Sequence, residues 1–174
     1  MTYGVSGSVA ALLPFNNTLL VSGSFATLSD GTTSARNLAV WTGSSWSSFP
    51  VGANSGGGVS GLNVSAAAVF NGRLVVGGYF TSVGPSNVPA NNVAIYDGAT
   101  GAWSALPVGS GNGVLGGRVT SLAVHDGKLY VGGTFLTLGN GTSANRIACF
   151  DGSTLSALPY RASNGVAGTV NALA

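Results

Sequence analysis

The sequence predicts an all-β fold built from a tandem repeat, and three observations support this prediction. A strand phrase that ends in phenylalanine occurs three times, and its closing residues Phe25, Phe80 and Phe135 are spaced by 55 residues. A turn signal precedes the phrase in each copy: Asn-Asn in the first, Asn-Gly in the second and Asp-Gly in the third. The 29 glycines and the absence of any helical period are typical of strands and turns. A long repeat carried by strand phrases indicates an array of stacked sheets.

Each repeat begins with two predicted strands. The first strand is expected at residues 9–12, 64–67 and 119–122. The turn that follows is Asn16-Asn17, Asn71-Gly72 or Asp126-Gly127, and these residues tolerate the positive φ of a two-residue type I′ hairpin. The second strand is the repeated phrase itself, where two successive glycines in the later copies allow a neighbouring backbone to approach closely.

The second half of each repeat contains two more predicted strands. Polar segments of about ten residues, at 26–36 and 81–91, are expected to form surface loops. A third strand that ends on an aromatic residue follows, and a fourth strand is closed by Pro50, Pro107 or Pro159, since proline cannot continue a ladder. The glycine-rich segments 51–63 and 108–118 are expected to link one unit to the next.

Four short antiparallel strands per unit describe a blade of a β-propeller. The predicted blades span about 8–60, 61–116 and 117–168, and residues 169–174 begin a fourth unit. Three blades plus one strand cannot close a ring that takes roughly four to eight blades. We therefore expect an excerpt of a larger propeller, or neighbouring copies that supply the missing blades. A parallel β-helix is the structural alternative, but its coils are much shorter and do not need Asn-Gly hairpins.

The repeat resembles known families. Gly77-Gly78 after an apolar strand, followed by Tyr96 and Trp103, resembles the kelch motif. The wider phrase resembles the repeats in extracellular β-propellers of the fungal cortical cell-polarity marker type and in related bacterial surface proteins. The middle copy fits best, whereas the first copy has Ser22 in place of the leading glycine and the third has Leu155 in place of tryptophan. The resemblance implies a cell-surface setting, a role in polarity and a membrane anchor outside this segment; kelch-like propellers include enzymes, adaptors and adhesins.

The composition restricts the classes of function. Charged residues make up only 6% of the chain, glutamate is absent and the net charge is +2, so a nucleic-acid partner is not expected. So weak a charge favours an extracellular, cell-surface or assembled setting. No stretch approaches the roughly 18 apolar residues of a membrane span. The lone Cys149 excludes an internal disulfide and is predicted to be a buried small hydrophobe, like Val40 and Ile95 at the same repeat position.

The sequence offers no catalytic constellation, and we predict no catalytic residue, metal site or cofactor. Three of the four acids, Asp97, Asp126 and Asp151, stand in hairpin turns, where aspartate bonds to local backbone donors. His125 has no repeated carboxylate or nucleophile beside it. Exposed aromatic residues could form a sugar platform, but packing between blades is favoured for all of them. They are Tyr3, Tyr79, Tyr130, Trp41, Trp46 and Trp103.

The few charges separate by loop type. In a four-stranded blade, the long loops and the links lie at one face and the tight turns at the other. The long-loop set contains one acid, Asp30, and four arginines: Arg36, Arg118, Arg146 and Arg161. Arg73 and Lys128 belong to the other face, with the three turn aspartates. The long-loop face is therefore the candidate for binding anionic groups or a partner; solvated arginines or hydrogen bonds to backbone carbonyls are the alternative.

Three glycosylation sequons begin at Asn16, Asn63 and Asn140. This number is about what chance would produce in a chain rich in asparagine, serine and threonine. Asn140, in a long loop, is expected to be the most accessible, and Asn63, at a strand entrance, is the least convincing.

These observations lead to three hypotheses of function. The first is a non-catalytic extracellular or cell-surface propeller module for recognition or adhesion, which binds a protein or a glycan at the long-loop face. The second is a structural subunit of a fibre or coat that self-associates by blade packing. The third and weakest is a fragment of a carbohydrate-active kelch-like enzyme.

Overall fold

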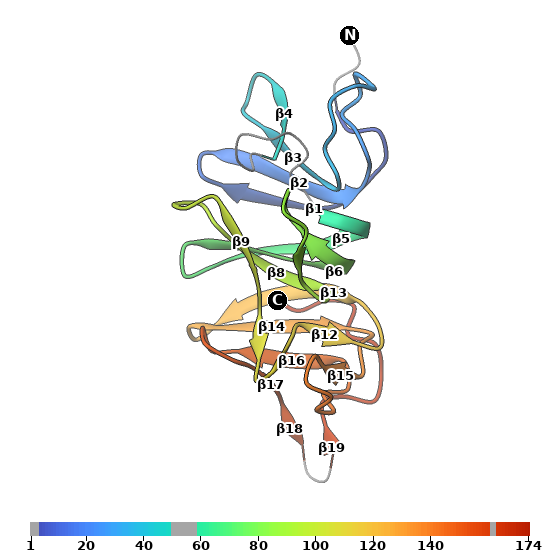
Figure 1. Ribbon diagram of the computed structural model, residues 1–174, viewed down its shortest axis with the longest axis vertical. Helices are drawn as coiled ribbons and strands as arrows, with labels where there is room; N and C mark the ends of the chain where they lie inside the picture. The colour runs from blue at the N-terminus through green and yellow to red at the C-terminus, as the bar shows by residue number, and fades with distance from the viewer. Residues whose placement is uncertain (1–3, 50–58, 161–162) are drawn as a thin grey trace.

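Three antiparallel sheets follow one another along the long axis of the molecule, each built on four main strands, and the second sheet has a short fifth strand (Figure 1). The computed structural model describes residues 4–49, 59–160 and 163–174. Every regular element within these ranges is a β-strand, and the strands of each sheet pair in chain order. The all-β prediction and the prediction of four-stranded propeller blades are confirmed.

Each sheet is a meander of consecutive antiparallel strands. The first sheet contains β1 (Ser8–Phe15), β2 (Thr18–Ser24), β3 (Leu38–Trp41) and β4 (Trp46–Ser48). The second contains β5 (Val59–Phe70), β6 (Arg73–Val83), β8 (Val93–Asp97) and β9 (Ala102–Ala105), and the short β7 (Val88–Pro89) pairs with the end of β6. The third contains β13 (Val119–His125), β14 (Lys128–Gly133), β16 (Ile147–Phe150) and β17 (Leu155–Ala157).

Short strands also form in the segments that the sequence analysis expected to be links and surface loops. They are β10 (Pro107–Val108) with β11 (Gly111–Asn112), β12 (Val114–Leu115) with β15 (Thr137–Leu138), and β18 (Pro159–Tyr160) with β19 (Ser163–Asn164). In addition, β5 begins inside the predicted link and β6 continues into the predicted loop. The expected surface loops are therefore not wholly irregular, because link and loop backbones satisfy their hydrogen-bonding groups by pairing.

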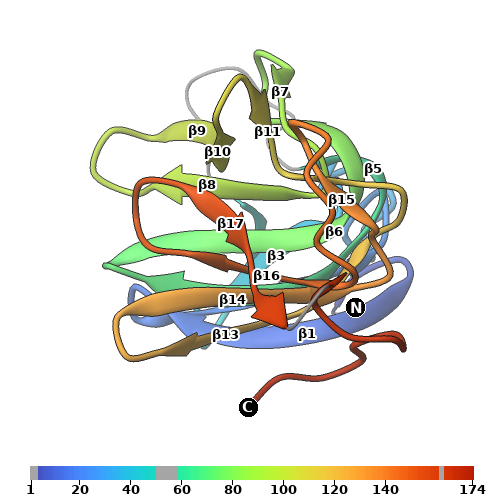
Figure 2. The ribbon, with the colours of Figure 1, turned by 90° about the horizontal axis from the view of Figure 1, so that it is seen from below.

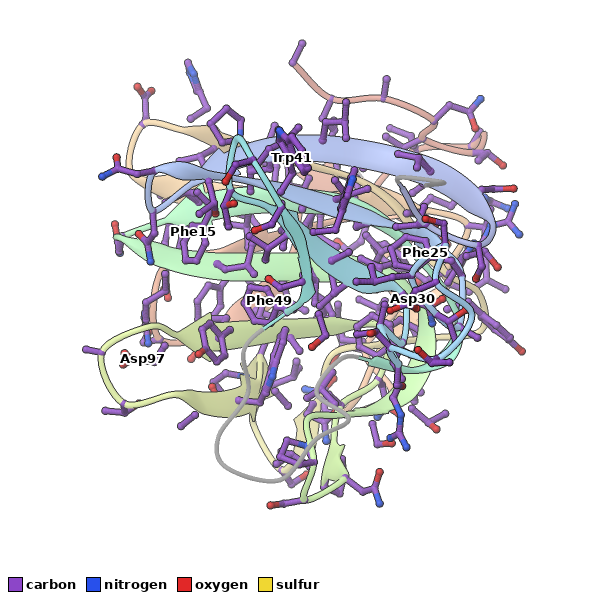
Figure 3. The ribbon with its side chains drawn as sticks, turned by 90° about the horizontal axis from the view of Figure 1, so that it is seen from above. Phe15, Phe25, Asp30, Trp41, Phe49 and Asp97 are labelled. Carbon is purple, nitrogen blue, oxygen red and sulfur yellow. The ribbon has the colours of Figure 1, made fainter. Side chains whose placement is uncertain are left out.

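The tight turns have the predicted geometry. Both residues of each hairpin turn lie in the left-handed region, with φ of 48° and 59° at Asn16 and Asn17, 49° and 72° at Asn71 and Gly72, and 48° and 68° at Asp126 and Gly127. This pair of positive values is the signature of a type I′ turn. The tight turns gather on one side of the stack and the long loops on the other (Figure 2). Figure 3 shows this with Asp97 on the turn side and Asp30 on the loop side.

Two hydrophobic clusters lie between neighbouring sheets, and a third lies on the first sheet beside its long loop. One cluster joins the first sheet to the second, and in it the Phe49 ring lies 4.9 Å from the Tyr96 ring and 6.0 Å from the Trp103 ring. A second cluster joins the second sheet to the third, where the Phe70 and Phe150 rings lie 5.7 Å apart. Because each blade buries one face against each neighbour, the apolar residues that alternate along a strand divide between two interfaces.

Glycines in the second strand allow a valine of the next unit to pack directly on the backbone. A β-carbon added at Gly77 would lie 2.4 Å from Cγ1 of Val119, and one added at Gly132 would lie 2.5 Å from Cγ1 of Val170. Each first strand also contains a bulge directly after Val9, Val64 or Val119, which the sequence analysis did not foresee. Val170 belongs to residues 169–174, which were predicted to begin a fourth unit. It lies against Gly132 of the third sheet, as Val119 lies against Gly77 of the second.

Candidate functional site

The candidate site is the long-loop face, which we define as the β2–β3, β6–β8 and β14–β16 loops together with the links between sheets. A buried asparagine anchors this face. The Asn92 side chain accepts a hydrogen bond from the backbone N–H of Phe80 at 3.1 Å and donates to the carbonyls of Val114 at 2.8 Å and Gly117 at 3.1 Å. One side chain thus joins the second strand, the third strand and the following link.

The accepting contact recurs in the first blade, and the third blade has a different residue at this position. Asn37 accepts from the backbone N–H of Phe25 at 3.0 Å, and it has a φ of 69°, close to the 64° of Asn92. In the third blade the position is occupied by Arg146, with a φ of 74°. Asparagine tolerates this left-handed conformation better than most residues.

Arg146 is therefore a structural residue in this conformation. Its Nη1 donates to the carbonyl of Val166 at 3.2 Å, as Asn92 donates to Val114 in the preceding blade. This contact matches the alternative interpretation of the loop arginines, a hydrogen bond to a backbone carbonyl. Arg146 also lines a cavity together with Asn145, Asn164, Ile147 and Leu158.

The remaining loop arginines are less constrained. Arg36 and Arg118 are exposed, and they stand in the first blade and in the link between the second and third blades. Arg161 lies outside the described residues. Among the described residues, the structure gives no contact that joins these arginines into one anion site. Their role in binding stays a prediction.

Asp30, the acid of this face, is bound to its own loop. Its carboxylate accepts the backbone N–H groups of Thr32 at 2.9 Å and Thr33 at 2.8 Å, and also the hydroxyl of Thr33. These hydrogen bonds, first of all the one from the Thr33 hydroxyl, lower the pKa of Asp30 to about 2. The side chain thus stabilises a turn and remains ionised at neutral pH.

The long-loop face exposes apolar side chains that blade packing does not use. Their exposed fractions are 49% for Tyr79, 38% for Leu115, 44% for Leu136 and 43% for Val166. Leu115 and Leu136 are adjacent, because the backbone N–H of Leu136 donates to the Leu115 carbonyl at 3.0 Å. Exposed apolar residues gathered beside polar loops are typical of interaction surfaces.

A cavity of about 640 Å³ and another of about 620 Å³ open on this side of the molecule. The second lies between the β6–β8 loop and the link to the third blade. It is lined by Tyr79, Phe80, Thr81, Asn91, Asn92, Leu115, Gly116 and Gly117. A phenol ring, side-chain amides and exposed backbone around one hollow can bind a neutral polar ligand.

The sequence analysis missed Tyr79, because it assigned every aromatic residue to packing. The prediction is right for Trp103, which is buried, and only in part for Trp41, Trp46 and Tyr130, which are half-buried. Tyr3 lies outside the described residues. The repeat itself contained the signal, since Ser24 and Thr134 occupy the Tyr79 position in the other blades and no large side chain is needed there.

The sequon asparagines differ in accessibility. Asn140 is exposed, and its side-chain oxygen accepts the backbone N–H of Thr142 at 3.0 Å. Asn16 is exposed in the first tight turn. Asn63 is half-buried, and its oxygen accepts the backbone N–H of Tyr79 at 3.2 Å and the Ser65 hydroxyl at 3.3 Å. The Asn63 side chain is thus held by hydrogen bonds to neighbouring residues, whereas the Asn140 side chain is accessible to solvent.

The groups considered for catalysis lie apart from this face. His125 and Asp126 form an exposed pair, with 3.3 Å between Nε2 and Oδ2, at a tight turn. Cys149 is half-buried, not buried as its counterparts Val40 and Ile95 are, and burial raises the pKa of its thiol. Within the described ranges no three histidine, cysteine or acidic side chains gather in a way that could hold a metal ion. No helix in this part of the chain is long and apolar enough to cross a membrane.

Comparison with known proteins supports the fold. A family model described as a domain of unknown function (DUF5122) β-propeller matches residues 71–94 and 125–153. Each matched segment runs from a tight turn through the second strand and the long loop into the third strand. No curated protein matches the chain.

Proposed function

We propose that this chain is a non-catalytic β-propeller segment of an extracellular or cell-surface protein, and that it recognises a glycan or protein partner through the long-loop face. The observation that carries the proposal is the cavity beside Tyr79 and Leu115, where two large apolar side chains are exposed at positions that packing leaves free. Loops on a rigid sheet scaffold are the usual place for binding residues.

A glycan suits the chemistry of this hollow best. The aromatic face of Tyr79 can contact sugar C–H groups, and none of the described residues that line the hollow has an ionised side chain. Arg118 follows Gly117 directly in the chain and is exposed, so an acidic sugar would find a cation beside the hollow. The low overall charge and the resemblance to polarity-marker and bacterial surface repeats favour a cell-surface setting. We include adhesion and a role in polarity in the proposal on that resemblance.

The experiment compares the two sides of the blades. The fluorescently labelled chain is applied to an array of neutral and acidic oligosaccharides, together with Tyr79→Ser/Leu115→Ser and a matched control, Val69→Ser/Val124→Ser. The control replaces two apolar residues that are also exposed but stand beside the tight turns. We expect the first double variant to lose at least ten-fold in affinity and the control to bind like the wild type.

Two results would contradict the proposal. An equal loss in both double variants would show that binding does not depend on the long-loop face. Binding to no sugar, together with no crosslink to a cell-surface protein from a photoreactive group at residue 79, would leave the face without a partner. A crosslink from residue 79 but not from residue 99 would identify the partner as a protein.

A further inference from the structure

Asparagine followed by glycine is the residue pair most prone to deamidation. In this reaction the backbone nitrogen of the second residue attacks the side-chain amide of the first, and glycine has no β-carbon to obstruct the attack. The chain contains four such pairs: Asn71-Gly72, Asn112-Gly113, Asn140-Gly141 and Asn164-Gly165. Because the local chemistry of the four pairs is the same, the fold decides which of them reacts.

In three of the pairs the attacking nitrogen is held by a hydrogen bond. The glycine N–H donates to a backbone carbonyl at 2.9 Å in each case: Gly113 to Leu106, Gly141 to Leu138 and Gly165 to Leu158. An N–H that donates to a carbonyl loses its proton to base less readily, and its nitrogen is not free to turn toward the side chain. These three glycines are therefore poor nucleophiles in the folded chain.

The side-chain amides of the same three pairs are also engaged. Each is hydrogen-bonded to a backbone group: Asn112 Oδ1 accepts from Asn91 at 2.9 Å, Asn140 Oδ1 accepts from Thr142 at 3.0 Å, and Asn164 Nδ2 donates to Ser143 at 3.0 Å. The attack requires the side chain to bring its Cγ onto the neighbouring nitrogen. Each of these bonds must break before that rotation can occur.

The pair Asn71-Gly72 has neither restraint. Among the described residues, the structure gives no hydrogen bond to the Asn71 side chain and none from the Gly72 N–H. Both residues are exposed in the tight turn between β5 and β6, and a β-carbon added at Gly72 would meet nothing within 4 Å. Base and water therefore reach both reacting groups.

We propose that Asn71 is a deamidation site of the folded protein. Base removes the proton of the Gly72 N–H, and the nitrogen attacks Cγ of Asn71. The N–Cγ bond forms as the Cγ–Nδ2 bond breaks, so that Nδ2 takes up a proton and leaves as ammonia, and a succinimide ring remains. Water then opens the ring: cleavage of the N–Cγ bond gives aspartate, and cleavage of the bond to the main-chain carbonyl carbon gives isoaspartate. The reaction needs no oxidant or reductant, and it does not depend on a partner of the long-loop face.

The aspartate product fits the fold, because the third blade already has this residue in the same turn. The φ values of Asp126 and Gly127 are 48° and 68°, close to the 49° and 72° of Asn71 and Gly72. In the structure, Nδ2 of Asn71 lies 3.7 Å from a β-carbon placed on Gly152, in the β16–β17 turn of the next blade. The aspartate therefore adds a negative charge beside that turn and leaves the hairpin intact.

The isoaspartate product does not fit, because it adds a methylene group to the main chain of a two-residue turn. The turn sets the register in which Phe70 pairs with Arg73. Phe70 is fully buried, and its ring lies 5.7 Å from the ring of Phe150 in the third blade. A longer turn disturbs this register and the contact between the two blades, so the isoaspartyl chain is expected to unfold at a lower urea concentration.

The test compares the folded chain with the chain unfolded in urea. Both are incubated at the same mildly alkaline pH, and peptide mass spectrometry follows the exchange of NH₂ for OH at each asparagine. In the folded chain Asn71 is expected to react several-fold faster than Asn140, the exposed asparagine of another pair, whereas in urea the two are expected to react at similar rates. Asn71→Gln is expected to stop the reaction at this turn, since glutamine would have to close a six-membered ring.

A second measurement separates the added charge from the added methylene. Asn71→Asp carries the charge alone and is expected to unfold like the wild type in urea. The aged chain, with its isoaspartate identified by an isoaspartyl methyltransferase, is expected to be less stable than this variant. Equal stability of the two would contradict the predicted effect on the turn.

Two results of the rate comparison overturn the proposal. Equal rates at Asn71 and Asn140 in the folded chain would show that the hydrogen bonds of Asn140 and Gly141 do not protect them. A lead of Asn71 that is equally large in urea would show that neighbours in the sequence, and not the fold, select the site.

Discussion

The Val119 side chain lies on the backbone of Gly77, where the first strand of the third blade crosses the second strand of the second blade. A methyl group at residue 77 would stand 2.4 Å from Cγ1 of Val119, closer than real contacts allow. Overpacking of this kind costs about 1–3 kcal/mol. We therefore expect Gly77→Ala to lower the free energy of unfolding by that amount, as measured by urea denaturation.

Gly98→Ala is the matched control for this prediction. Gly98 stands in an exposed turn, and an added β-carbon there would meet only the Asn16 side-chain nitrogen at 3.5 Å, an ordinary contact. Its unfolding midpoint is expected to stay close to that of the wild type. If both alanine variants unfold at the same urea concentration, the stability of the blades does not depend on the close contact between Val119 and the Gly77 backbone.

The first blade has no glycine at this position of the second strand. Ser22 stands where Gly77 and Gly132 stand in the other blades. The Ser22 side chain is fully buried, and its hydroxyl has no hydrogen-bond partner among the described residues. An unpaired buried hydroxyl costs about 1–3 kcal/mol. Ser22→Ala is therefore expected to raise the free energy of unfolding by about 1 kcal/mol, whereas Ser47→Ala, at an exposed strand position, should leave it unchanged. A loss of stability in Ser22→Ala would mean that the hydroxyl has a partner.

Asn92 is expected to be among the most sensitive positions. Asn92→Ala removes three hydrogen bonds to backbone groups and leaves the Phe80 N–H and the Val114 carbonyl without their partner. Loss of such a buried network costs about 2–4 kcal/mol. The change should appear as a lower midpoint in thermal unfolding.

The control for Asn92→Ala is Asn87→Ala. Asn87 also has a left-handed backbone, with a φ of 50°, but it is exposed. Both variants pay the same conformational cost, so the difference between their stabilities reports the hydrogen bonds alone. Similar unfolding temperatures would show that the backbone conformation, and not the side-chain network, makes asparagine necessary at residue 92.

Much of the blade could be predicted from the sequence because its signals are local. Asn71-Gly72 determines a turn by itself, and the alternation of apolar residues determines which way a strand faces. The short strands of the links could not be predicted in this way. β12 and β15 are separated by more than twenty residues, and their pairing depends on how the blades pack and not on their own composition.

The candidate site was less predictable than the fold. The distribution of charges made the long-loop face a candidate, which stays a prediction. It could not show that Arg146 bonds to the Val166 carbonyl, since this bond depends on the backbone of the following link. Tyr79 was assigned to packing because aromatic residues usually pack, and only the comparison with Ser24 and Thr134 distinguishes it. A repeat therefore indicates candidate binding residues best at the positions where its copies disagree.

The Asp151 carboxylate provides a prediction of pH dependence. Hydrogen bonds from the backbone N–H of Thr154, then from Ser153, lower its pKa from 3.8 to about 2. Because the folded pKa lies below the unfolded one, the stabilisation by this carboxylate is complete above pH 3.8 and is lost as the pH falls through about 2. We expect the carboxyl carbon resonance of Asp151 to titrate with a midpoint near 2, and Asp151→Asn to flatten part of the decline in stability below pH 4. The part of this decline in stability that is due to Asp30, whose pKa is also about 2, should remain in the variant. A midpoint near the ordinary 3.8 would show that the turn does not hold the carboxylate in solution.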